Sequence, residues 1–129
     1  MKLNHDCVRA LLLHIEDTIS IGCRISTDDI ELTGFDKNDI IYSAIKLLEA
    51  GFISGKYSED MTGNISVIIS GITWEGHKFL DTIRDNKVWV TTKNVLSKVS
   101  SASISFASTV ASQVLTNIIS QSLGVQSTI

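Results

Sequence analysis

The chain of 129 residues has no proline and only two cysteines. Without proline, glycine is left to mark the ends of the structural elements. Cys7 and Cys23 are too few for a disulfide scaffold, and we expect both to be reduced. No apolar run approaches the roughly 20 residues of a membrane span, and the polar start does not resemble a signal peptide. These absences predict a cytoplasmic protein that does not contact a membrane.

The chain also lacks an excess of positive charge. It has 11 basic against 14 acidic residues and a net charge of −3, so no overall field attracts a polyanion. With 43% hydrophobic residues, a chain of this length is expected to fold around one main core. From residue 99 to the end there is no charged residue at all, which sets that segment apart from the rest.

Apolar residues recur every fourth position over residues 3–20 and predict a helix that faces the core, capped by Asn4 or Asp6. Residues 24–26 suggest a short strand, and residues 27–29 a brief helix. This stretch is where a helix-turn-helix places its first, supporting helix. We therefore expect a degenerate version of that helix.

The stretch over residues 36–50 predicts an amphipathic helix that Asp36 caps and Gly51 ends. A step of about 100° per residue places Ile40, Ile41, Ala44, Leu47 and Leu48 on the inner face, with Ile45 at its edge. The same step places these residues outward: Asn38, Asp39, Tyr42, Ser43, Lys46 and Glu49.

Residues 52–70 read as a β-hairpin, because a β-branched run follows a polar turn that contains Gly63. Thr73 then caps a helix over residues 73–85, in which we expect Trp74, His77, Phe79, Leu80 and Ile83 to be buried or half-buried. Helix, glycine and hairpin in this order predict a winged helix-turn-helix.

The predicted fold is α+β and mostly α, a winged helix-turn-helix with a β-hairpin wing and an additional C-terminal amphipathic helix. Residues 1–86 form the winged-helix domain, residues 87–102 a linker or helix extension, and residues 103–125 the C-terminal helix. The predicted core consists of Val8, Leu11, Leu12, Ile15, Ile40, Ala44, Leu47, Leu48, Phe52, Ile53, Val67, Ile69, Phe79 and Ile83.

No catalytic constellation is visible. Cys7 and His14 lie on one helical face, but a zinc site needs further ligands, and none has the right spacing. No phosphate-binding loop and no nucleophile elbow occur. We therefore expect neither an enzyme nor a bound metal or cofactor.

A winged helix usually contacts nucleic acid or another protein. Residues expected to contact a partner are Asn38, Tyr42, Ser43, Lys46, Lys56 and Tyr57. Over residues 36–60, three lysines stand against five acidic residues, and this net charge of −2 opposes binding to phosphates. Both partner classes stay open: a host or phage protein, or DNA read through base edges.

The uncharged tail favours self-association, because a long apolar face would otherwise be an exposed patch. The residues expected to meet a second copy in a homodimer are Ile104, Ala107, Ala111, Val114, Leu115, Ile118 and Ile119. The alternative is a helix that packs onto its own chain. A membrane-surface helix would carry basic residues on its polar face, and this one has none.

Four segments resemble a family of phage and prophage proteins, domain-of-unknown-function family 2513. They read MKLNHDCVRALLLHIED, GFDKNDIIYSAIKLLEAGFISG, ITWEGHKFLDTIRD with Trp89 after it, and ISFASTVASQVLTNIISQSLG. The middle part is also similar to YjcQ-like winged-helix proteins of phages. The resemblance implies a winged helix in a mobile-element or bacterial cytoplasmic setting, and it implies no activity and no site residues. The tail of this chain is richer in serine and poorer in lysine and glutamate than the family pattern.

Together these features predict a non-catalytic winged-helix regulatory or adaptor protein that binds a host protein or DNA. Two alternatives are a sequence-specific DNA-binding transcriptional regulator and a purely structural oligomerisation module.

Overall fold

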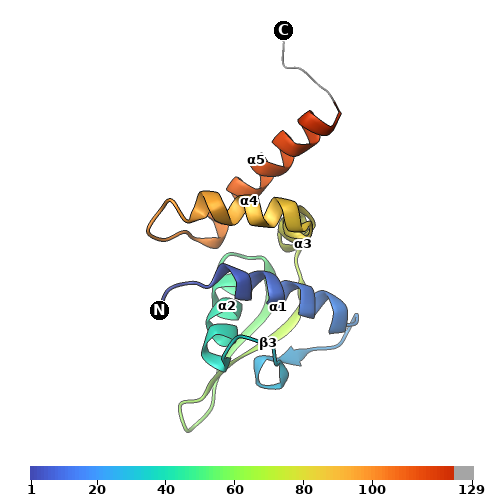
Figure 1. Ribbon diagram of the computed structural model, residues 1–129. Helices are drawn as coiled ribbons and strands as arrows, with labels where there is room; N and C mark the ends of the chain where they lie inside the picture. Colours follow the sequence, from blue (N-terminus) through green and yellow to red (C-terminus); the bar gives the residue numbers. More distant parts are fainter. Residues whose placement is uncertain (124–129) are drawn as a thin grey trace. The chain divides into compact units, whose positions relative to one another are not determined.

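The computed structural model describes residues 1–123. The fold is mixed α+β and mostly helical, with a small antiparallel sheet of three strands in the order β1-β3-β2. The chain divides into two compact units, Met1–Leu80 and the part that begins at Asp81. Figure 1 shows the course of the chain through both units.

Helix α1, His5–Thr18, begins at Asn4, whose side chain accepts a hydrogen bond from the amide of Cys7 at 3.2 Å. The predicted stripe is confirmed, because Cys7, Val8, Leu11, Leu12 and Ile15 are all buried. The helix is slightly shorter than residues 3–20, since its cap lies at residue 4 and its backbone is extended at residue 19.

Between α1 and α2 the chain forms a short strand and a single helical turn. Strand β1, Ile25–Ser26, is followed by the 3-10 helix η1, Thr27–Asp29. The buried hydroxyl of Thr27 accepts a hydrogen bond from the amide of Val67 at 3.0 Å and so attaches this turn to β3. The expected short strand and brief helix are both confirmed.

Helix α2, Lys37–Glu49, is capped by Asp36, which accepts from the amide of Asp39 at 2.8 Å. It packs against α1, β2 and β3 (Figure 1). Gly51 adopts φ +79° immediately after the helix, as expected of a residue that ends it.

Two residues of α2 lie differently from the prediction. Ser43 was placed outward and is buried at 1% exposure, whereas Leu48 was placed in the core and is only half-buried. The buried residues of α2 follow the i, i+3, i+4, i+7 pattern, namely Ile40, Ser43, Ala44 and Leu47. The buried face of α2 is therefore rotated by about 50° from the predicted one, toward Ser43, whose small side chain interacts with the buried Cys7 of α1.

The predicted hairpin is confirmed. Strand β2, Ile53–Glu59, pairs antiparallel with β3, Ile65–Ile72, and β1 pairs antiparallel with the other edge of β3. Of the predicted core residues, all except Leu48 are buried.

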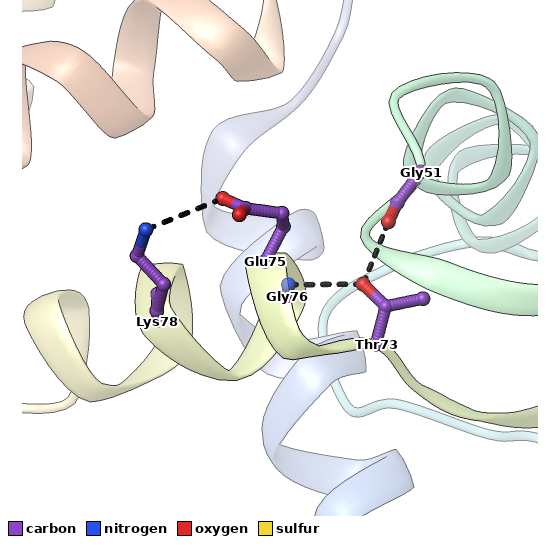
Figure 2. Close-up of polar contacts among 5 residues, drawn as sticks. All are labelled: Gly51, Thr73, Glu75, Gly76 and Lys78. Carbon is purple, nitrogen blue, oxygen red and sulfur yellow. Dashed lines mark hydrogen bonds and ion pairs between the residues drawn. The ribbon is translucent and has the colours of Figure 1, made fainter.

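Helix α3, Trp74–Ile83, is joined to the end of α2 through Thr73 (Figure 2). The Thr73 hydroxyl donates to the carbonyl oxygen of Gly51 at 2.6 Å and accepts from the amide of Gly76 at 3.1 Å. A Cβ on Gly76 would overlap the carbonyl oxygen of Phe52. Glycine is therefore required where α3 approaches the start of β2.

The predicted burial of α3 is correct for three residues and wrong for two. Phe79, Leu80 and Ile83 are buried, and the Phe79 ring lies 5.4 Å from that of Phe52. Trp74 is 77% exposed and His77 is also exposed. The reason is the Thr73 cap, because it fixes the helix with Gly76 and Phe79 toward the hairpin and so turns residues 74 and 77 outward.

In the second unit, the segment predicted as a linker or helix extension forms a helix of its own. Helix α4, Asn86–Leu96, begins at Asp85, whose carboxylate accepts from the amides of Lys87 at 2.8 Å and Val88 at 3.2 Å. Its buried residues are Val88, Trp89, Thr92 and Leu96. The lysines of this segment made its helical periodicity hard to recognise in the sequence. Asp85 caps the helix.

Helix α5, Ile104–Ser122, is capped by Ser103, whose hydroxyl accepts from the amide of Phe106 at 3.1 Å. It crosses α4, and its C-terminal half extends beyond α4 (Figure 1). Residues 124 and 125, the end of the predicted segment 103–125, lie outside the described residues.

Candidate partner-binding groove

A groove of about 510 Å³ opens between α2 and the end of the β2–β3 hairpin. We call it the α2–hairpin groove. Its lining residues are Met1, Asp28, Lys37, Asn38, Ile41, Tyr42, Ile45, Gly63, Asn64 and Ile65. Its volume lies within the range of about 300–1,000 Å³ that is typical of ligand sites.

The groove uses a second stripe of α2, next to the one that faces the core. The stripe consists of Asn38, Ile41, Tyr42 and Ile45, in the i, i+3, i+4, i+7 pattern of one helical face, and Ile65 of β3 lines the groove with them. Ile41 and Ile45 are half-buried. The apolar face of α2 is therefore wider than its packing in the core requires.

The predicted contact residues do not form one cluster. Asn38 and Tyr42 line the groove, whereas Lys46 follows Tyr42 on α2 without lining it. Lys56 and Tyr57 are exposed on β2 and do not line it either. Ser43 is buried, so its expected place on the outer face of α2 is wrong.

The groove residues that come from outside α2 were not predicted from the sequence. Asp28 belongs to η1, and Gly63, Asn64 and Ile65 to the end of the hairpin. No local pattern joins positions so far apart in sequence. The one available signal was Ile41 with Ile45, which widen the apolar face of α2 beyond a single stripe.

The lysine at the start of α2 is held by the protein itself. The Nζ of Lys37 donates to the carbonyl oxygens of Ile30 at 2.7 Å, Thr27 at 3.0 Å and Asp28 at 3.2 Å. An ammonium group has three donors, and these contacts use all of them. Lys37 therefore fastens η1 to α2 and has no donor left for a ligand.

The second lysine of α2 is also engaged. Lys46 forms an ion pair with Glu49 at 2.9 Å, and its Nζ lies 5.3 Å from the centre of the Tyr42 ring. The hydrogen bond and charge of Glu49 raise the pKa of Lys46, with a smaller contribution from Tyr42. An exposed pair of this kind contributes little stability, but it places a carboxylate beside the cation.

The hairpin turn next to the groove is built around Asp60. One carboxylate oxygen accepts hydrogen bonds from the Thr62 hydroxyl at 2.6 Å, the Thr62 amide at 2.8 Å and the Asn64 amide at 3.0 Å. These bonds, led by that of the Thr62 hydroxyl, hold the pKa of Asp60 below its usual value. The turn is therefore ordered and negatively charged.

The face of α5 that was expected to contact a second copy is buried in its first half and partly exposed toward its C-terminal end. Ile104, Ala107, Ala111 and Val114 are buried in their own chain, where α5 packs on α4. Toward the C-terminal end, Leu115 and Ile118 are half-buried, while Ile119 is 46% and Leu123 71% exposed.

Residues 1–123 contain neither a membrane-spanning helix nor a cluster of metal-binding side chains. No helix in this part is long and apolar enough to cross a membrane. Nor do any three histidine, cysteine, aspartate or glutamate side chains in it gather as a metal site.

Fold and groove together define a small α+β protein with a recess between a helix and a hairpin. The chain belongs to the family described as "Hypothetical protein (DUF2513)", whose model matches residues 2–103. It is also 34% identical over 124 residues to an "Uncharacterized protein" of Haemophilus influenzae, and the match covers 95% of this chain and 99% of that one. No solved structure gives a significant match.

Proposed function

We propose that this protein is a non-catalytic, cytoplasmic adaptor of phage or prophage type, built on a winged helix, that binds a partner protein through the α2–hairpin groove. The element order supports a winged helix, since α1, β1, α2 and the β2–β3 hairpin follow one another and β1 pairs with β3. In this interpretation η1 replaces the supporting helix and the hairpin is the wing.

We favour a protein partner over DNA because both lysines of α2 already form contacts within the protein. Binding to nucleic acid depends on cations that neutralise phosphates. Lys37 donates hydrogen bonds to three carbonyl oxygens, and Lys46 forms an ion pair with Glu49. Lys56 is exposed on β2, but Glu59 and Asp60 follow it at the end of the wing. A duplex would therefore meet more negative than positive charge.

The groove has features that suit a protein partner. Tyr42 and the isoleucines offer apolar contact, and Asn38 and Asn64 offer hydrogen bonds at its edge. Aromatic side chains in such recesses are frequent anchors of interfaces. Tyr57, 49% exposed on β2, extends the same kind of contact along the hairpin.

The test combines a duplex assay with site-specific crosslinking. The full chain is expected to retain no duplex in a gel shift at about 50 mM salt, where electrostatic binding is strong. A photo-crosslinking residue at Asn38 is expected to capture a protein in cells, and the same residue at exposed Asp17 of α1 is the matched control. Retention of duplex that Lys56→Glu abolishes would overturn the proposal in favour of a DNA-binding regulator.

A second candidate function is self-association through the end of α5. Exposed Ile119 and Leu123, with half-buried Leu115 and Ile118, form an apolar end beyond the part of α5 that packs on α4. No charged residue occurs on α5, so two copies would not repel one another. A symmetric pair is the commonest assembly of this kind.

A further inference from the structure

We propose that the occupant of the α2–hairpin groove is a basic segment of a partner protein, in which an apolar side chain is flanked by lysines or arginines. This inference rests on the proposed function and specifies its partner. It follows from the contrast between the lining of the groove and its rim.

The lining supplies the site for the apolar side chain. Ile41 and Ile45 on α2 and Ile65 on β3 are half-buried and face the recess, with Tyr42 beside them. Filling this space with an apolar group would remove the remaining exposed area of these side chains from water, which is favourable. Asn38 and Asn64 at the edges can bond the backbone of a bound segment.

The rim supplies negative charge from several elements. Asp28 lines the groove, and Asp29 and Asp36 directly neighbour the lining residues in sequence. The backbone amide of Asp60 donates to the carbonyl oxygen of Asn64 at 2.9 Å, and Glu59 pairs with Ile65 in the register of β2 and β3. All five carboxylates are exposed, and within residues 1–123 none of them forms a salt bridge.

The cations at the groove do not cancel this charge. Lys37 and the amino group of Met1 belong to the lining, and the ammonium of Lys37 points into the carbonyl oxygens of η1. Lys2, Lys46 and Asp39 also directly neighbour the lining residues in sequence. Four positive groups therefore stand against six negative ones, and of the four Lys37 is used by carbonyl oxygens and Lys46 is paired with Glu49 at 2.9 Å. Complementary charge raises the association rate and selects among partners, so a positively charged segment fits this rim and an acidic one is repelled.

The experiment measures binding of three short fluorescent peptides to the full chain by anisotropy. The first carries leucines between lysines, the second has serine at every leucine, and the third has glutamate at every lysine. The first is expected to bind at least about tenfold more tightly than either of the others, a difference of about 1.4 kcal/mol. Equal binding of the first two peptides, or no binding of the first, would overturn the inference.

Two variants link that binding to the groove. Glu59→Lys is expected to weaken binding of the first peptide about tenfold, whereas Asp17→Lys, the same charge change on α1, leaves it unchanged. Ile45→Thr is expected to weaken the first peptide while it leaves the weak binding of the serine peptide as it was. Thermal melts establish that each variant is folded. Equal effects of Glu59→Lys and Asp17→Lys would contradict a groove-specific site.

The crosslink at Asn38 separates this inference from the proposed function. A captured segment with clustered lysines or arginines around an apolar residue supports both. A captured segment that is acidic overturns the basic partner and leaves the proposed protein-binding function standing. Duplex retention without a protein crosslink overturns both.

Discussion

The hydroxyl of Thr73 lies 2.6 Å from the carbonyl oxygen of Gly51, to which it donates, while it accepts from the amide of Gly76. One side chain thus bonds a carbonyl oxygen just after α2 and caps the first turn of α3. The amide of Thr73 adds a bond to the carbonyl oxygen of Phe52 at 3.1 Å. The hydroxyl and the amide of Thr73 thus connect the residues that follow α2 to the first turn of α3.

Thr73→Val should therefore destabilise the first unit. Valine has nearly the same shape but loses the cap, and the loss of a helix cap costs about 0.5–2 kcal/mol. Thr73→Ser keeps the hydroxyl and is the control. Chemical denaturation of the full chain measures the free energy of unfolding for each. Equal stability of the valine and wild-type proteins would show that the two hydrogen bonds contribute nothing.

Neighbouring leucines on α2 should differ in their contribution to stability. Leu47 is fully buried, so Leu47→Ala is expected to cost about 2–5 kcal/mol, as cavity-forming substitutions do. Leu48 is only half-buried, and Leu48→Ala should cost roughly 1 kcal/mol, near the centre of the range for point substitutions. Urea unfolding of both variants tests the order. The reverse order would mean that the buried face of α2 follows the original prediction.

Asp60 should make the hairpin turn sensitive to acid. Its pKa is lowered in the folded protein, so its contribution to stability is present above the ordinary carboxyl pKa and is lost as the pH falls through the lowered value. Asp60→Asn keeps an acceptor oxygen but does not titrate. The thermal midpoint of the wild type should exceed that of this variant at neutral pH, and the difference should shrink below about pH 4. A difference that is constant with pH would contradict this role.

The two cysteines should react very differently. Cys7 is fully buried, and burial raises the pKa of its thiol, an effect that the Ser43 hydroxyl partly opposes. Cys23 is exposed. A thiol reagent at neutral pH should modify Cys23 rapidly, and it should reach Cys7 only when the first unit opens. Labelling of Cys23→Ser and Cys7→Ser proteins measures each rate. Fast labelling of Cys23→Ser would contradict the burial of Cys7.

The end of α5 provides a test of self-association. If Ile119 contacts a second copy, the full chain should have the mass of a dimer in light scattering and Ile119→Asp that of a monomer, because a carboxylate buried in an interface is costly. Asn117→Asp places the same charge at an exposed position about 200° around α5 from Ile119 and should leave the dimer intact. A monomeric wild-type chain at all concentrations would leave α5 as a helix that packs only on α4.

The sequence by itself determined the local elements of this protein. Asn4, Asp36, Thr73 and Ser103 act as helix caps, and Gly51 ends α2, because these residues satisfy or shape the backbone only a few positions away. The hairpin follows from β-branched residues on both sides of a polar turn. For the same reason, the helical stripes of α1 and α5 were visible without a structure.

Only the tertiary structure decided which faces are covered. Because α2 packs against α1, its buried face includes Ser43, and Leu48 lies at the edge of that face. The Thr73 cap turned Trp74 outward, and packing on α4 covered the first half of the α5 face. The groove depends on Asn38 of α2 and Asn64 of the hairpin lining the same recess, and Lys37 donates to carbonyl oxygens of η1 and the residue after it. Such contacts depend on the positions of whole elements in space, which the periodicity of a single element does not encode.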